Sequence, residues 1–201
     1  MTNQTAQAEV ERIVWQGRFL TTKVRGTWEY VGRSRGIRAA VILALDTDEN
    51  GQDHVLLVEQ FRVPLGRACI ELPAGLIGDE EHLAQEDPAT AAARELEEET
   101  GYRAGQMEVL GEFWSSPGMV SESYTLLRAR DLVRVCNGGG TAEENITVHR
   151  VPLHELAQFV ADRRALGDAI DGKLLLLLGP TMTGPTALTT PAPDKALHSA
   201  P

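Results

Sequence analysis

Three acidic residues are spaced so that one face of a helix would carry all of them. Glu95, Glu98 and Glu99 stand at positions i, i+3 and i+4 of a segment that contains no Lys. Like charges at this spacing repel one another, so the cluster needs a compensating cation. Mg²⁺ and Mn²⁺ prefer oxygen ligands, and carboxylates one helical turn apart can converge on one ion. The spacing predicts a divalent-metal site in which Arg94 orients one carboxylate, with a merely solvated helix face as the alternative.

The segment around these carboxylates carries signals for both ends of a helix. Asp87 is placed to cap it, Pro88 suits the first helical position and Gly101 suits a left-handed stop. The helical period places the carboxylates beside the apolar stripe and predicts that Glu97, on the opposite arc, faces solvent. The predicted buried stripe consists of Ala89, Ala92, Ala93, Leu96 and Thr100.

The elements that must position this helix are predicted to be mostly strands. Two or three short strands are expected between Ile13 and Arg33, with breaks at its glycines, which include Gly32. Further strands are expected at 39–45 and 54–61, as a hairpin or neighbouring core strands, and at 107–114, 124–128 and 146–151; helices are expected at 152–163 and 169–178. Strands and helices mixed without regular alternation predict an α/β (α+β) fold with a mixed sheet, not a doubly wound parallel fold.

Length and charge limit the possible functions. The chain has 201 residues, of which 42% are apolar, enough for one substantial core. The formal charge of −10 argues against a nucleic-acid partner, because neutralising phosphates requires clustered Lys and Arg. No apolar run approaches the roughly 20 residues of a membrane span, so no membrane partner is expected.

Composition also indicates a compartment and a tail. Cys69 and Cys136 lie far apart without a partner motif, which suits a reducing environment better than a disulfide framework. The polar start, residues 1–9, lacks the features of a secretory signal, so a cytoplasmic location is expected. The composition turns to Pro, Thr and Ala after Gly179, and residues 180–201 are predicted to be a disordered tail.

The carboxylate helix and the loop before it resemble the Nudix box, the signature of a hydrolase family. Its pattern is Gly, five residues, Glu, seven residues, Arg-Glu, an apolar residue, any residue, Glu-Glu, any residue, Gly and an apolar residue. Glu86 to Tyr102 matches this pattern without a gap, whereas Gly75 to Glu86 is five residues longer than the pattern allows. We infer a small insertion, between Gly78 and Gln85, that leaves the carboxylate spacing intact.

The resemblance implies roles for the acidic residues of the box. Glu95 and Glu99 would be the principal ligands of Mg²⁺ or Mn²⁺, and Glu98 a further ligand or a catalytic group close to the metal. Glu86 would tie the loop to the helix, and Arg94 would belong to the catalytic set.

Segments outside the box resemble the ADP-ribose pyrophosphatase branch of this family. They are residues 59–62, 71–75 and 116–122, and Pro117 stands sixteen residues after Gly101, a marker of that branch. By this resemblance the carbonyl of Ala74 would join the metal sphere. Arg62 would contact phosphate, with a structural ion pair as its alternative, and Glu71 and Glu122 would line the substrate site, Glu122 at the terminal ribose.

Two nucleotide contacts and the catalytic base stay open at this point. Trp28 would stack on adenine or be a core tryptophan, and either Arg35 or Arg38 would reach the nucleotide. The family's late acidic loop matches residues 138–148, where Glu144 is preferred as base and metal ligand over Glu143, with Glu122 in reserve. The glycines at 138–140 suit a loop that closes over substrate or simply a flexible connection.

The expected function is metal-dependent hydrolysis of ADP-ribose to AMP and ribose 5-phosphate. The alternatives are another nucleoside diphosphate sugar or NADH as substrate, and, from a different class, a non-catalytic nucleotide-binding regulatory module. Residues 37–179 would form a Nudix-type α/β/α sandwich. Residues 1–36 would supply N-terminal antiparallel strands that contact nucleotide and mediate a homodimer.

Overall fold

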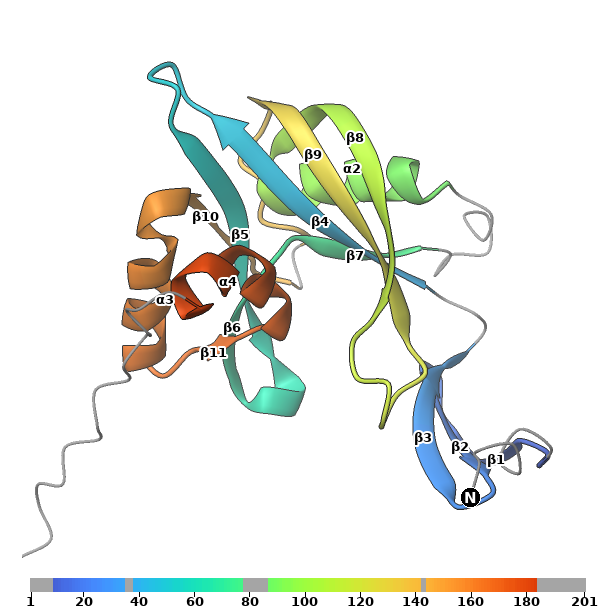
Figure 1. Cartoon of the computed structure of the whole chain (residues 1–201). Helices are drawn as coiled ribbons and strands as arrows, with labels where there is room; N and C mark the ends of the chain where they lie inside the picture. The colour runs from blue at the N-terminus through green and yellow to red at the C-terminus, as the bar shows by residue number, and fades with distance from the viewer. Residues whose placement is uncertain (1–8, 35–37, 78–86, 142–143, 184–201) are drawn as a thin grey trace, which may run out of the picture.

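The computed structural model describes residues 9–34, 38–77, 87–141 and 144–183, and two sheets organise them. A three-stranded antiparallel sheet is built from β1 (Arg12–Gln16), β2 (Leu20–Arg25) and β3 (Trp28–Arg33). It stands at one end of the molecule, apart from the main body (Figure 1). Three strands in this region agree with the prediction from the sequence.

The main sheet has eight strands and mixed pairing. Its order is β11-β6-β5-β4-β9-β8, with β10 paired to β5 and β7 paired to β4. The β4–β9 and β11–β6 pairs are parallel and the other pairs are antiparallel, which confirms the predicted mixed sheet. The strands are β4 (Arg38–Thr47), β5 (Asp53–Arg62), β6 (Arg67–Glu71), β7 (Ala74–Ile77), β8 (Tyr102–Trp114), β9 (Ser123–Arg134), β10 (Thr147–Pro152) and β11 (Ala169–Ile170).

Strand β4 is shared between two partners along one edge. Its first residues, Arg38 to Val41, pair with β7, and its last residues, Leu45 to Thr47, pair with β5. Its other edge pairs with β9 in parallel. Because β5 and β7 take different halves of β4, the sheet opens between them, and the cavity described below lies at this opening.

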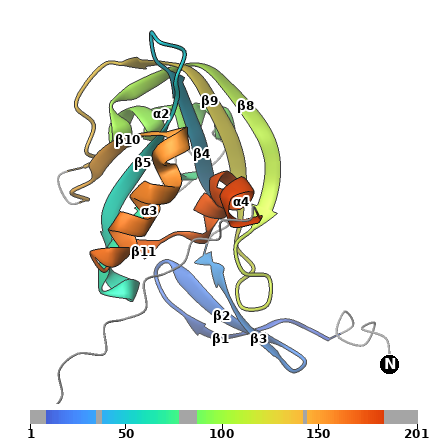
Figure 2. The same ribbon diagram turned by 60° about the vertical axis from the view of Figure 1, so that its left-hand side comes forward.

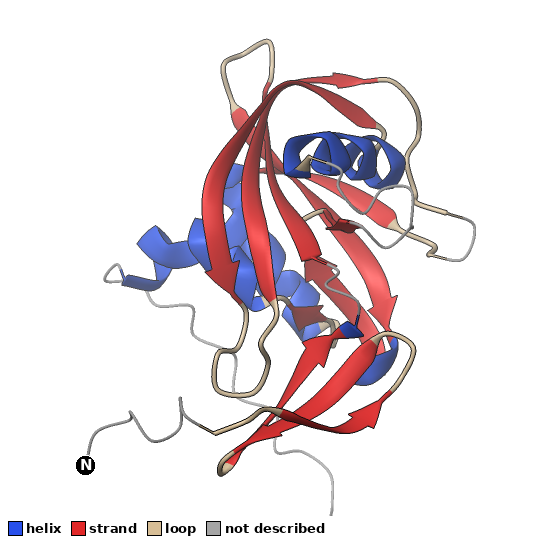
Figure 3. Cartoon of the chain, turned by 90° about the vertical axis from the view of Figure 1, so that its right-hand side faces the viewer, coloured by secondary structure: helices blue, strands red, loops and turns tan. Residues whose placement is uncertain are grey.

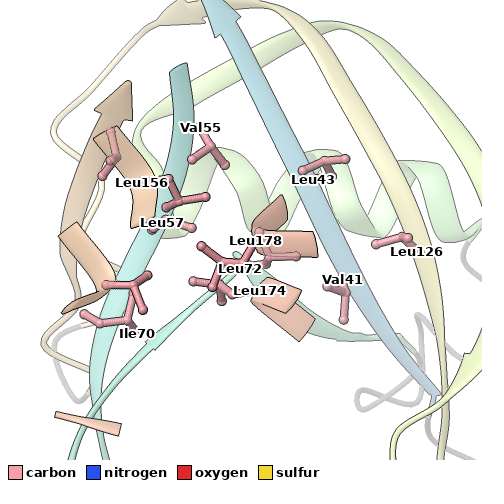
Figure 4. Close-up of a cluster of buried hydrophobic side chains, with 12 residues drawn as sticks. Val41, Leu43, Val55, Leu57, Ile70, Leu72, Leu126, Leu156, Leu174 and Leu178 are labelled. Atoms are coloured by element: carbon pink, nitrogen blue, oxygen red, sulfur yellow. The ribbon is translucent and has the colours of Figure 1, made fainter. Parts of the chain in front are cut away.

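Helices cover both faces of the main sheet. Helix α2 (Pro88–Thr100) lies on one face, and α3 (Leu156–Ala165) and α4 (Leu175–Thr183) lie on the other (Figures 2 and 3). Alternate residues of β4 enter the two cores, as the pleat of a strand requires. Ala40, Ile42 and Ala44 pack toward α2, whereas Val41 and Leu43 pack in the other core (Figure 4).

Several predicted features of the chain differ from the structure. Strands β6 and β7 were not predicted. Gly32 was expected to break a strand but lies inside β3, where a Cβ atom would meet the hydroxyl of Ser121, so the glycine allows a close approach. The helix expected at 169–178 is a short strand, β11, then a 3₁₀ turn, Gly172–Leu174, and then α4, which continues through Pro180 to Thr183, four residues into the predicted tail. Ala169 and Ile170 pair with Cys69 and Ile70 instead, because β6 offers an open edge there.

No helix among the described residues is long and apolar enough to span a bilayer.

Candidate active site

Helix α2 forms as its end signals predict. The Asp87 carboxylate accepts hydrogen bonds from the backbone N–H groups of Ala89 and Thr90, and Gly101 ends the helix at φ 77°. Its buried side differs from the predicted stripe, however. Ala91 and Glu99 are buried, whereas Ala89 and Ala93 are only half-buried. The helix is thus rotated so that one carboxylate points into the protein.

The three carboxylates of α2 occupy different environments. Glu99 is only 5% exposed, the side chain of Glu95 is 17% exposed and that of Glu98 is 50% exposed. Arg94 bridges the outer two, with Nη1 at 3.0 Å from Glu95 and 3.2 Å from Glu98. Glu97 points away from this group and forms a bidentate pair with Arg103, both bonds at 2.9 Å.

Glu99 is held by two donors from the sheet. The backbone N–H of Ala74 donates to Oε2 at 3.0 Å, and Nε2 of Gln60 donates to Oε1 at 3.3 Å. Burial raises the pKa of Glu99 to about 8, and the negative charges of Glu95 and Glu144 act in the same direction. The ionised form of Glu99 therefore carries a charge that the protein alone leaves poorly compensated.

A cavity of about 400 Å³ opens beside these groups. Ala74 and Gly75 of β7 line it next to Glu95 and Glu99, and Gly75 has no Cβ in the space that the Glu95 side chain occupies. The acidic and basic residues that line it, among those the structure describes, are five carboxylates and three cations: Glu71, Glu95, Glu99, Glu122, Glu144, Arg33, Arg62 and Lys173.

Two ion pairs stand on the wall of the cavity. Arg62 binds Glu71 through two parallel bonds, of 2.5 Å from Nε and 3.0 Å from Nη2, and Glu71 is buried. Arg62 therefore forms the structural ion pair considered from the sequence while it also faces the cavity. Nε of Arg33 lies 2.6 Å from Oε1 of Glu122, which joins the end of β3 to the start of β9.

The loop that carries Glu144 is bonded to the C-terminus of α2. The backbone N–H groups of Gly139 and Gly140 donate to the carbonyls of Glu99 and Glu98, at 2.8 Å and 3.0 Å. The glycines at 138, 139 and 140 have φ values of 64°, 109° and 69°, which favour glycine. Their role in this structure is thus a fixed helix cap, where the sequence suggested a closing loop or a flexible connection.

Glu144 lines the cavity on this loop. Its Oε2 accepts hydrogen bonds from the backbone N–H of Thr141 at 2.8 Å and from the Thr141 hydroxyl at 3.0 Å. Glu143, the other candidate base, lies outside the described residues, as do Arg35 and Glu86.

Two other predicted substrate contacts lie away from this cavity. Arg38 is exposed at the start of β4 and is not part of the lining. Trp28 is 51% exposed, so it is not a core tryptophan, and it lines a second cavity of about 300 Å³ together with Pro117. Within one chain, Trp28 is thus not brought beside the carboxylates.

Gln60, Arg33 and Lys173 line the cavity but have no individual role in the sequence analysis. Gln60 lies within the segment 59–62, so its position next to Arg62 was the available signal. Arg33 and Lys173 come from opposite ends of the chain, and no local pattern links either of them to the box.

The donor set fits a hard divalent cation that is shared with a substrate. Among the described residues no group of three or more His, Cys, Asp or Glu side chains forms a complete metal site. Mg²⁺ needs no such group, because proteins usually hold it through one or two carboxylates plus substrate phosphates and water. Glu95 and Glu99 provide two carboxylates in one cavity, and burial, which raises the pKa of Glu99, favours a compensating cation beside its ionised form.

The sequence matches a known family over most of its length. A family model described as the NUDIX domain matches residues 36–170, more than half of the 201 residues. The chain belongs to the Nudix domain family, which confirms the resemblance drawn from the box.

Relatives with several different names share this domain. The chain is 37% identical over 127 residues to the methanol dehydrogenase activator of Bacillus methanolicus, covering 63% of this chain and 64% of that protein. It is 36% identical to the GDP-mannose pyrophosphatase of Klebsiella pneumoniae, with 62% of each chain covered. It is 39% identical to the ADP-ribose pyrophosphatase of Bacillus subtilis, with 47% and 46% covered. The chain spans between 46% and 64% of the length of these three relatives.

The fold has a counterpart among solved structures. A crystal structure of an ADP compounds hydrolase aligns with a TM-score of 0.60, covering 87% of this chain and 92% of that chain. At 21% sequence identity this likeness shows a shared fold. It confirms the predicted sandwich of helices around a mixed sheet.

Proposed function

We propose that this protein is a hydrolase that uses Mg²⁺ or Mn²⁺ to cleave the diphosphate bond of a nucleoside diphosphate sugar, with ADP-ribose as the leading substrate. The observation that carries the proposal is the buried carboxylate of Glu99 beside Glu95 on the wall of one cavity. Nudix family membership and the names of two relatives support the same reaction class.

The charge of the cavity supports a requirement for metal. Among the described residues, five carboxylates line it against three cations, so this lining in its ionised form would repel a diphosphate. Divalent cations bound between carboxylates and phosphates would reverse this repulsion. The same excess of acid disfavours a non-catalytic module that binds nucleotide through the protein alone.

Each residue then has a definable task. Glu95 and Glu99 would hold the cation, with the Ala74 carbonyl and Glu98 as further oxygen donors. A divalent cation at this position would supply neutralisation of the phosphate charge and a lower pKa of the attacking water. Arg62, oriented by Glu71, donates its remaining N–H groups to a phosphate oxygen. Glu144 accepts the proton of the water that adds to phosphorus, and the bridging oxygen leaves with the other phosphate, giving AMP and ribose 5-phosphate.

The substrate choice is tested by a panel. Purified protein is incubated with ADP-ribose, ADP-glucose, GDP-mannose, NADH and diadenosine polyphosphates, each with Mg²⁺, with Mn²⁺ or with EDTA, and the products are identified. We expect AMP and ribose 5-phosphate from ADP-ribose at the highest kcat/KM, and no turnover in EDTA. GDP-mannose or NADH as the best substrate would replace ADP-ribose, and turnover of none of them would reject the proposed function.

We also propose a homodimer in which residues 1–36 contact a second copy. Many of the exposed large apolar side chains lie on β1–β3 and on β8–β9, and an exposed apolar surface of this kind is typical of a protein–protein interface. They are Ile13, Val14, Trp15, Leu20, Trp28, Val109, Leu110, Phe113, Trp114 and Val133. The free thiols of Cys69 and Cys136 support the proposed cytoplasmic location.

A dimer is expected to depend on this apolar surface. Light scattering should give about twice the chain mass of 21.9 kDa, and Trp15→Asp should shift the protein to monomer. Leu166→Asp, which alters an exposed leucine at the end of α3, is the matched control and should remain dimeric. A monomeric wild type would reject the proposed dimer and would leave the proposed reaction unaffected.

A further inference from the structure

Lys173 reaches the cavity from the C-terminal part of the chain. It lies in the 3₁₀ turn Gly172–Leu174, and its side chain is 24% exposed. Its Nζ stands 5.8 Å from the centre of the Tyr124 ring and 2.5 Å from the Asp171 carboxylate. Lys173 and Tyr124 both line the cavity, so an ammonium group and an aromatic face are presented together.

The fold fixes this lysine through its backbone. The N–H of Asp171 donates to the carbonyl of Ile70 at 3.0 Å, which continues the pairing of β11 with β6. The Asp171 carboxylate accepts from the backbone N–H of Lys173 at 2.7 Å, and Leu174 is fully buried. A half-buried, anchored lysine loses little further entropy when it binds a ligand.

A second cation lies in the same region of the cavity. Arg33 is paired with Glu122, and Glu122 is two residues from Tyr124 at the start of β9. Tyr124 pairs with Ala39 on β4, another lining residue, and stacks on Phe113 at 6.0 Å. Arg33 and Lys173 both lie outside residues 36–170, the part that the family model matches. The segments that flank the family domain therefore supply these two cations.

The pairing of these cations indicates what they bind. Lys173 and Arg33 are each paired with one carboxylate, so neither pair carries a net charge. A neutral ion pair still offers N–H donors and carboxylate acceptors, which match hydroxyl groups that both donate and accept. Tyr124, whose phenol group also donates and accepts hydrogen bonds, lines the same cavity.

We propose that Lys173, with Arg33, Glu122 and Tyr124, binds the sugar beyond the diphosphate and so determines which nucleoside diphosphate sugar is accepted. This inference rests on the proposed function and extends it to a residue outside the matched domain. Lys173 then acts on the substrate half that leaves as sugar phosphate, whereas the nucleotide half is bound elsewhere.

The test measures separately how the protein binds each half of the substrate. Lys173→Met keeps the apolar stem and removes the charge, and Lys173→Arg restores a cation. With Mg²⁺ present, we expect Lys173→Met to raise the KM for ADP-ribose by about 10- to 100-fold, the effect of losing hydrogen bonds to a charged group, with kcat within about threefold. Binding of ribose 5-phosphate should weaken by the same factor, binding of AMP should not change, and Lys173→Arg should recover most of the loss.

Arg150→Met is the matched control. Arg150 is also paired with one carboxylate, that of Asp46, its side chain is 33% exposed, and it does not line this cavity. Its removal should leave KM unchanged. If the wild type turns over ADP-ribose and Lys173→Met has the same KM, the role of Lys173 is overturned and the proposed function stands. A wild type that cleaves no nucleoside diphosphate sugar would overturn both, and weaker AMP binding would place Lys173 at the nucleotide instead.

Discussion

Glu99→Gln is expected to lower kcat with ADP-ribose by at least 10²- to 10³-fold and, in the same protein, to raise the stability of the metal-free fold. The loss follows because the amide removes a full negative charge from the proposed cation site, where preorganised electrostatics are worth this much or more. The gain follows because the amide still accepts the N–H of Ala74 but no longer buries a charge near Glu95 and Glu144.

The stability gain has a defined pH dependence. In the folded wild type the pKa of Glu99 is raised from 4.5 to about 8, so the folded state holds a proton that the unfolded chain has already lost. The free energy of unfolding of the wild type therefore falls as pH rises from about 4.5 to about 8. Glu99→Gln lacks this loss of stability. In EDTA, the melting temperature of the variant should therefore exceed that of the wild type by more at pH 8 than at pH 5.

The matched control for this experiment stands on the same helix. Glu97→Gln alters a carboxylate that is bound to Arg103 and lies outside the cavity, so kcat should stay within about twofold. Added Mg²⁺ should raise the melting temperature of the wild type and of Glu97→Gln but not that of Glu99→Gln. Near-normal turnover by Glu99→Gln would remove Glu99 from the metal site.

Glu144→Gln is expected to lower kcat by about 10²- to 10⁴-fold, the usual contribution of a general base, with little change in KM. The carboxylate lines the cavity, and Thr141 holds it there through two hydrogen bonds. If Glu144 is the base, the acidic limb of the pH profile of kcat should disappear in the variant. Its fold should be intact, because Glu144 is exposed.

Glu143→Gln is the comparison that decides between the two candidates of the loop. It changes the same charge one residue away, and we expect turnover within about threefold of wild type. The reverse result, with Glu143→Gln impaired and Glu144→Gln active, would transfer the role of base to Glu143. If both variants are active, Glu122 is the remaining candidate, and Glu122→Gln is the next measurement.

The prediction of the fold succeeded where the signals are local. The cap at Asp87, the stop at Gly101 and the hairpin of β4 and β5 were each predicted from short patterns of residue types. It failed where a distant partner decides. Ala169 and Ile170 form a strand because the open edge of β6 lies beside them, and Gly32 is required by contact with Ser121. A pattern of residue types along the chain does not reveal either of these neighbours.

The placement of Glu95, Glu98 and Glu99 within about one turn of a single helix was determined by the sequence alone, because their spacing is that of the helical period. Only the tertiary structure decided how those carboxylates differ. Gln60, 39 residues away, and Ala74, 25 residues away, bury Glu99 and leave Glu98 in solvent. The structure likewise decided that Arg33 meets Glu122 across 89 residues and that Lys173 reaches Tyr124. Helix periodicity is a property of neighbouring residues, whereas burial and charge pairing arise only when the sheet brings separate segments together.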